Sequence, residues 1–188
     1  IDLSTPDTVI LTAPSGTIGA VASEVTFESP GDAAATFVCA VDGAAFAPCT
    51  SPYAIAALPS GGHVVQVQAT NAAGTIDPSP ATRIWLVDAT APAPTFTLSP
   101  ASVLDRTAPP AMFGFAADEP SAFTCAVDGG AATACDAPWT SPALGAGPHE
   151  LVLTATDAYG NAGQVDHAWT IAPETVICID IAPGASSG

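Results

Sequence analysis

Five cysteines are the residues of this chain whose type and spacing could support chemistry. Four of them form two pairs, Cys39 with Cys49 and Cys125 with Cys135, and Cys178 stands alone. A cysteine pair can form a disulfide, bind zinc or act in redox catalysis. Zinc sites are usually built from closer pairs or with nearby histidines, and neither accompanies these cysteines. We therefore interpret both pairs as structural disulfides, which suit an oxidising compartment.

A β-hairpin is the element that must position each pair. Phe37, Cys39 and Val41 recur at every second position, as in a half-buried strand. Asp42 and Gly43 follow and supply the two residues with positive φ that a type I′ turn needs. The sequence thus predicts a hairpin with strands near residues 36–41 and 44–46, closed by a disulfide.

The hairpin occurs twice, with its cysteines 86 residues apart (39 and 125, 49 and 135). His63 and Gly74 recur at the same offset as His149 and Gly160. This internal repeat predicts two domains, residues 6–88 and 89–172. We interpret residues 1–5 as a linker from a preceding repeat and residues 173–188 as the start of a third repeat, or as a strand given to or received from another copy. A chain that begins with Ile and carries no signal peptide is expected to be a mature or excised piece.

Short alternating segments separated by Pro- and Gly-rich turns predict seven strands per repeat and no helix. The expected architecture is all-β, with two antiparallel sandwiches in tandem. In the first repeat we expect strands at 9–12, 25–27, 36–41, 44–46, 53–58, 63–70 and 83–87. In the second we expect them at 95–98, 112–116, 123–127, 131–133, 139–144, 150–156 and 167–171.

The charge balance excludes several classes of partner. Lys and Arg together number 2 against 18 Asp and Glu, so the net charge is −16. Arg83 and Arg106 alone cannot build a basic patch, which excludes nucleic acid and disfavours an anionic membrane surface. No apolar run approaches the roughly 18 residues of a membrane span, so we expect no membrane insertion.

Other side chains that could do chemistry have simpler interpretations. Aspartates could bind calcium at a domain junction, with Asp88 and Asp157 as the candidates, although most aspartates here are typical turn formers. Histidines and serines are present, but no Gly-x-Ser-x-Gly elbow exists and the serines fall in turns. Trp85, Trp139 and Trp169 could form a sugar-binding platform. Trp85 and Trp169 recur at one place in each repeat and Trp139 replaces Tyr53, which favours core packing. We expect the protein to have no enzymatic activity and no cofactor other than this calcium.

The two ends of the chain contain strand-forming segments without a complete repeat around them. Cys178 has no partner cysteine, so it is a buried thiol, or it pairs with another chain or with a cysteine of a later repeat. Segments of this kind can complete a neighbour's sheet by strand addition. The candidates for strand addition are Val9, Ile10, Val176, Ile177 and Ile179.

Several short motifs occur in the same order and cover nearly the whole chain. They are Phe-x-Cys-x-Val-Asp-Gly, Cys-x-Ser-Pro, Gly-x-His, Ala-Thr-Asp-x-x-Gly-Asn and Trp-x-Val-Asp-x-Thr-x-Pro. This pattern resembles the bacterial immunoglobulin-like tandem repeats of large extracellular or cell-surface proteins. The resemblance implies immunoglobulin- or fibronectin-III-like sandwiches used as a spacer or adhesive stalk. The first repeat has Asn71 and Thr75 where the second has Asp157 and Asn161, which weakens the case for a shared calcium site.

Three functions follow as hypotheses. The first is a structural module, the stalk or spacer of an adhesin or surface protein, whose partners are neighbouring repeats of the same chain. The second is the subunit of an extracellular filament that joins copies of itself by terminal strand addition. The third is a binding module for a glycan or a surface protein.

Overall fold

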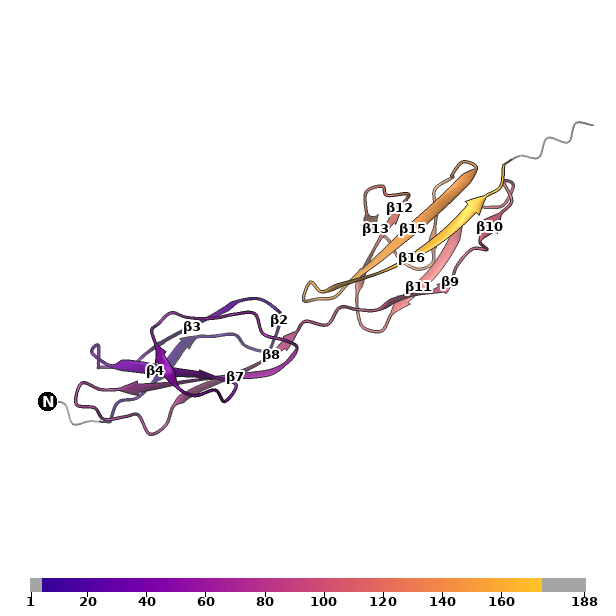
Figure 1. Cartoon of the computed structure of the whole chain (residues 1–188). Helices are drawn as coiled ribbons and strands as arrows, with labels where there is room; N and C mark the ends of the chain where they lie inside the picture. Colours follow the sequence, from indigo (N-terminus) through magenta and orange to yellow (C-terminus); the bar gives the residue numbers. More distant parts are fainter. Residues whose placement is uncertain (1–4, 174–188) are drawn as a thin grey trace, which may run out of the picture. The chain divides into compact units, whose positions relative to one another are not determined.

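The computed structural model describes residues 5–173, and within this range the chain forms sixteen β-strands and no helix. The chain divides into two compact units (Figure 1). The first contains the strands before Ala91, and the second begins at Pro92. Each unit contains eight strands in two sheets, so the predicted all-β class with two sandwiches is confirmed.

The first unit has a three-stranded and a five-stranded sheet. The small sheet has the order β1-β3-β6, and the large sheet has the order β2-β8-β7-β4-β5. All pairs are antiparallel except β2 with β8, which is parallel. The strands are β1 (Val9–Thr12), β2 (Thr17–Gly19), β3 (Ser23–Glu28), β4 (Thr36–Val41), β5 (Ala47–Cys49), β6 (Tyr53–Ile55), β7 (Gly61–Thr70) and β8 (Ala81–Asp88).

The second unit repeats this topology strand for strand. Its sheets have the orders β9-β11-β14 and β10-β16-β15-β12-β13, and β10 pairs with β16 in parallel. The strands are β9 (Pro94–Leu98), β10 (Val103–Leu104), β11 (Met112–Ala117), β12 (Ala122–Val127), β13 (Thr133–Ala134), β14 (Trp139–Thr140), β15 (Gly147–Thr156) and β16 (Ala162–Ile171).

Each unit has its own hydrophobic core between its two sheets. In the first, Val25 of β3, Val65 and Val67 of β7 and Trp85 of β8 are buried together. From His63 onward, β7 alternates buried and half-buried residues, because successive side chains of a strand point to opposite faces. The core of the second unit is built from Ala111, Phe113, Phe115, Cys125, Cys135, Leu151, Leu153 and Trp169.

The structure corrects several predicted strands. Each unit has eight strands rather than seven, because the short strands β2 and β10 were missed. The predicted strands at 53–58 and 139–144 end early, at Ile55 and Thr140. The second hairpin strand lies at Ala47–Cys49 rather than at 44–46, and at Thr133–Ala134 rather than at 131–133.

A one-residue bulge explains the displaced hairpin strand. Asp42 and Gly43 have φ of 53° and 75°, and Ala44 N–H donates to the Val41 carbonyl, as the predicted type I′ turn requires. A regular ladder from this turn would place Cys39 opposite residue 46, and Cys49 would then point to the outer face. Instead Cys39 lies opposite Ala47, so one extra residue returns both cysteines to the inner face.

The exposed edges of the sheets carry features that discourage pairing with other chains. In β1 the ladder with β3 is interrupted at Leu11, and in β9 the ladder with β11 is interrupted at Thr97. Such bulges make an edge strand a poor template for another strand. Pro48 occupies the middle of β5 and has no N–H to offer. Ala134 holds the corresponding position, 86 residues later, in β13.

Candidate functional site

The four paired cysteines form the predicted disulfides, one in each unit. Cys39 and Cys49 have Cα atoms 5.8 Å apart, and Cys125 and Cys135 have Cα atoms 5.9 Å apart. Each bond joins neighbouring strands of one sheet, whereas antibody domains join two sheets. Cys39 and Cys125 are buried in their cores, so these disulfides are structural rather than exposed to exchange.

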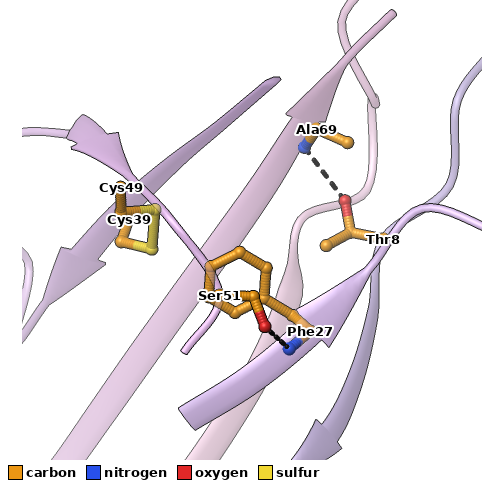
Figure 2. The surroundings of a disulfide bond; sticks show 6 residues. All are labelled: Thr8, Phe27, Cys39, Cys49, Ser51 and Ala69. Carbon is orange, nitrogen blue, oxygen red and sulfur yellow. Dashed lines mark hydrogen bonds between the residues drawn. A yellow bond between two sulfur atoms is a disulfide. The ribbon is translucent and has the colours of Figure 1, made fainter. Parts of the chain in front are cut away.

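Polar contacts hold the segments beside the first disulfide in place (Figure 2). Ser51, just after β5, accepts a hydrogen bond of 2.9 Å from the Phe27 N–H, which ties the end of the hairpin to the opposite sheet. The rings of Phe27 and Phe37 lie 4.9 Å apart. The disulfide therefore lies beside an aromatic pair at one end of the core.

A histidine holds the turn of each hairpin, and this arrangement was not predicted. Nδ1 of His63 lies 2.8 Å from Oδ2 of Asp42, and its Nε2 lies 2.8 Å from the Pro59 carbonyl oxygen. Asp42 also accepts a 2.9 Å hydrogen bond from the Val64 N–H. The ring lies 6.0 Å from the Trp85 ring, and His63 is only 7% exposed.

The second unit repeats this cluster. Nδ1 of His149 lies 2.8 Å from Oδ2 of Asp128, and its Nε2 lies 2.9 Å from the Gly145 carbonyl oxygen. The Glu150 N–H donates to Oδ1 of Asp128 at 2.9 Å, and the Trp169 ring lies 5.7 Å from the histidine. The recurrence of Asp42 with His63 as Asp128 with His149, at one offset, was the signal in the sequence.

The hydrogen bonds of these clusters change the pKa of their members. The Pro59 carbonyl and then Asp42 raise the pKa of His63, and Asp128 and then the Gly145 carbonyl raise the pKa of His149. Burial acts to raise the pKa of Asp42, but the bonds from Val64 and His63 outweigh it and the pKa is lowered. Because both ring nitrogens are engaged, neither histidine is available as a general base.

A buried aspartate organises the opposite end of the first unit. Asp77 is 0% exposed and accepts a 2.6 Å hydrogen bond from the Thr8 hydroxyl. The Thr8 hydroxyl in turn accepts the Ala69 N–H at 3.0 Å (Figure 2). The Ser79 N–H also donates to Asp77, at 2.8 Å. This cluster joins the entrance of β1 to β7 and has a structural role.

The three tryptophans do not form a sugar-binding platform. Trp85 and Trp169 are 2% exposed, and Trp139 packs against the second core. A platform needs exposed ring faces, so this alternative is wrong for these residues.

A surface hollow of about 480 Å³ lies beside Phe27 in the first unit and is lined by Glu28, Ser29, Asp32 and Phe37 among others.

The remaining candidate residues have mixed outcomes. Val9 and Ile10 pair with Glu28 and Phe27 of their own unit, so the expectation that they lack a partner strand is corrected. Asp88 is the last residue of β8 and Asp157 follows β15, so the two calcium candidates belong to different units, and the calcium site stays a prediction. Val176, Ile177, Cys178 and Ile179 lie outside the described residues. No helix in residues 5–173 is long and apolar enough to cross a membrane.

Comparisons with known proteins support the fold. No family model matches the sequence, and no curated protein matches it. A bacterial ice-binding adhesin of 1.5 MDa has a solved structure that matches 91% of this chain and 66% of its own, at 14% identity and a TM-score of 0.51. The fibronectin(III)-like modules of Clostridium thermocellum CbhA match 88% of this chain and 94% of their own, at 18% identity and a TM-score of 0.45. The adhesin match, whose TM-score exceeds 0.5, supports the predicted sandwich fold.

Proposed function

We propose that this chain is a non-enzymatic structural module of a bacterial extracellular or cell-surface repeat protein, where it serves as the stalk or spacer of an adhesin or related protein. The observation that carries the proposal is the tandem repetition of one disulfide-bonded sandwich, each copy with a separate core. Repeated modules with their own cores extend a chain without needing a shared active site.

Three further observations support this function. Two structural disulfides suit a protein that works in an oxidising environment. Both described histidine–aspartate pairs are fully engaged in holding turns. The fold is shared with a bacterial adhesin. The partners of such a module are the neighbouring repeats of its chain, and a surface protein or glycan bound by another part of the same protein.

Detection of the native protein tests this function. An antibody raised against the two units should recognise a polypeptide far larger than 18.5 kDa in the surface or secreted fraction of the source bacterium. Enzymatic removal of surface-exposed protein from intact cells should abolish the signal. A band of about this mass in the cytoplasmic fraction would contradict the proposal.

Self-association separates the spacer from the filament subunit. We expect the oxidised chain to sediment as a monomer at every concentration tested, because Val9 and Ile10 already have a partner strand. Cys178→Ser is the matched control, since it removes the cysteine outside the two disulfides and leaves strand addition intact. Concentration-dependent fibres that persist in Cys178→Ser would favour the filament.

The binding module is the third candidate, with the hollow beside Phe27 as its place on the first unit. A glycan array probed with the oxidised chain tests it. Binding that is lost in a Phe37→Ala variant, with the disulfide still formed, would favour this function over a spacer. An array without signal would remove glycans from the list of ligands.

A further inference from the structure

Three segments of the first unit meet at the His63 ring. Asp42 belongs to the turn of the disulfide hairpin, Pro59 to the loop between β6 and β7, and His63 to β7 itself. Trp85 of β8 lies beside the ring, and the ring is almost completely withdrawn from water. The contacts of this one side chain therefore join the loop to the turn.

The two oxygen atoms that face the ring are both acceptors. A carbonyl oxygen has no proton to give, and an ionised carboxylate also only accepts. A neutral imidazole carries a single N–H, so one of its nitrogens would direct a lone pair at an oxygen 2.8 Å away. Only the doubly protonated ring satisfies both contacts. His149 meets the same two kinds of oxygen, at 2.8 and 2.9 Å.

We propose that each unit carries a proton-operated clamp, in which the histidine binds as an imidazolium ion and ties the turn of the disulfide hairpin to the loop before β7 or β15. Loss of one proton breaks one of the two bonds. The carboxylate attracts the remaining N–H more strongly than a neutral carbonyl does, so the bond to Pro59 or Gly145 is the one that breaks. The clamp opens on the loop side and releases the loop.

The groups around each ring give the direction of the pH dependence. In the described part of the first unit, Asp42 is the ionisable partner of His63, the loop offers a carbonyl, and β8 offers the Trp85 ring. Arg83 lies two residues before Trp85 and is exposed, and in the second unit this position two residues before the tryptophan is His167. The first unit therefore gives the simpler test.

The sign of the pH dependence of stability follows from the raised pKa values of the two histidines. A histidine with a raised pKa stabilises the folded state fully below its unfolded value of about 6.5, and this contribution is lost as the pH rises through the folded value. Asp42 and Asp128 have lowered pKa values, so their contribution is present above about 3.8 and is lost as the pH falls through the folded value. Each clamp is therefore closed between the folded pKa of its aspartate and the folded pKa of its histidine.

Nitrogen NMR of the ring atoms tests the charge state directly. In the full oxidised chain at pH 6.5, where a free histidine is about half protonated, both ring nitrogens of His63 and of His149 should carry a proton, with the shifts of an imidazolium ion. A neutral tautomer of His63 at pH 6.5 would overturn the proposal. This measurement uses the unmodified protein and does not depend on any variant folding.

A matched pair of variants tests the link to stability. In Asp42→Asn with Asp128→Asn, the amide oxygen still accepts from the Val64 or Glu150 N–H, and the amide nitrogen can donate to a neutral histidine. Asn also tolerates the positive φ of the turn. Asp32→Asn with Asp105→Asn removes the same charge from turns that accept only local hydrogen bonds.

The variants are expected to differ in how steeply the unfolding equilibrium constant depends on pH. Above pH 6.5 the unfolding equilibrium constant of each unit in the unmodified chain should rise by up to about tenfold per pH unit, the limit for one linked proton. The control variant should keep this slope, and Asp42→Asn with Asp128→Asn should lose it. A flat profile for the unmodified chain, or an unchanged slope without the two carboxylates, would overturn the clamp.

Discussion

At the scale of single residues, the two units use different contacts to hold the segment that leads into the first strand of each sandwich. The first uses the hydroxyl of Thr8 and the buried carboxylate of Asp77. In the second, 86 residues after Asp77, the residue is Gly163, and the Pro92 carbonyl packs where its side chain would be. One copy fills this position with a polar network and the other with a close backbone approach.

Replacing Thr8 by Val should remove the network while keeping its volume. The Ala69 N–H loses its acceptor and Asp77 loses one donor, which should destabilise the first unit by about 1–3 kcal/mol. Thr12→Val is the control, because its hydroxyl is exposed and bonds only Thr26, and its effect should stay within about 0.5 kcal/mol. Urea unfolding measures both.

The same variant should change the acid sensitivity of the first unit. Burial acts to raise the pKa of Asp77, but the bonds from Thr8 and Ser79 outweigh it, so the pKa is lowered. The stability due to Asp77 is therefore present above about 3.8 and is lost as the pH falls through the folded value. Equal acid profiles for Thr8→Val and the unmodified chain would contradict this role.

Gly163→Ala should destabilise the second unit by about 1–3 kcal/mol, because its Cβ would overlap the Pro92 carbonyl oxygen and force the backbone apart. Gly145→Ala is the control in the same unit, since a Cβ there meets nothing within 4 Å. Thermal unfolding compares the two. Equal melting temperatures would show that the segment around Pro92 can shift without a loss of stability.

At the scale of elements, the edge strands of the large sheets can be tested with proline. The Cys135 N–H donates to the Phe123 carbonyl, so the alternation of an antiparallel ladder directs the Ala134 N–H outward. Ala134→Pro, which copies Pro48 of the first unit, should change stability by less than about 0.5 kcal/mol. Thr133→Pro removes an inward N–H and should cost about 1–3 kcal/mol by urea unfolding. A reversed order would mean that the assigned register is wrong.

The sequence predicted the elements that have strong local signals. Alternation identified β7, and Asp42-Gly43 identified the turn of the hairpin. The position of β5 was missed, although the spacing of Cys39 and Cys49 requires an extra residue to put both on one face. The strands β2 and β10 are two or three residues long and form through parallel pairing with distant strands, so no local pattern marks them. Asp42 was interpreted only as a turn former, which hid its contact with His63.

At the scale of the whole molecule, two separate cores predict two separate unfolding transitions. Phe113 is 0% exposed in the second core, and Phe113→Ala should cost about 3–5 kcal/mol. Hydrogen exchange resolved by residue should show the loss of protection in β11, β12 and β15 and unchanged protection in β4 and β7. Equal loss in both units would mean that they unfold as one.

The disulfide in each hairpin has a mechanical consequence for a module pulled from its ends. Cys39 and Cys49 are 10 residues apart in sequence, and their Cα atoms are 5.8 Å apart. When the unit is torn open, the loop between them stays closed, which hides about 30 Å of extended chain per unit. Single-molecule pulling should therefore record a rupture step about 30 Å shorter for the oxidised module than for the reduced one. The disulfide thus limits how far each unfolded unit can extend.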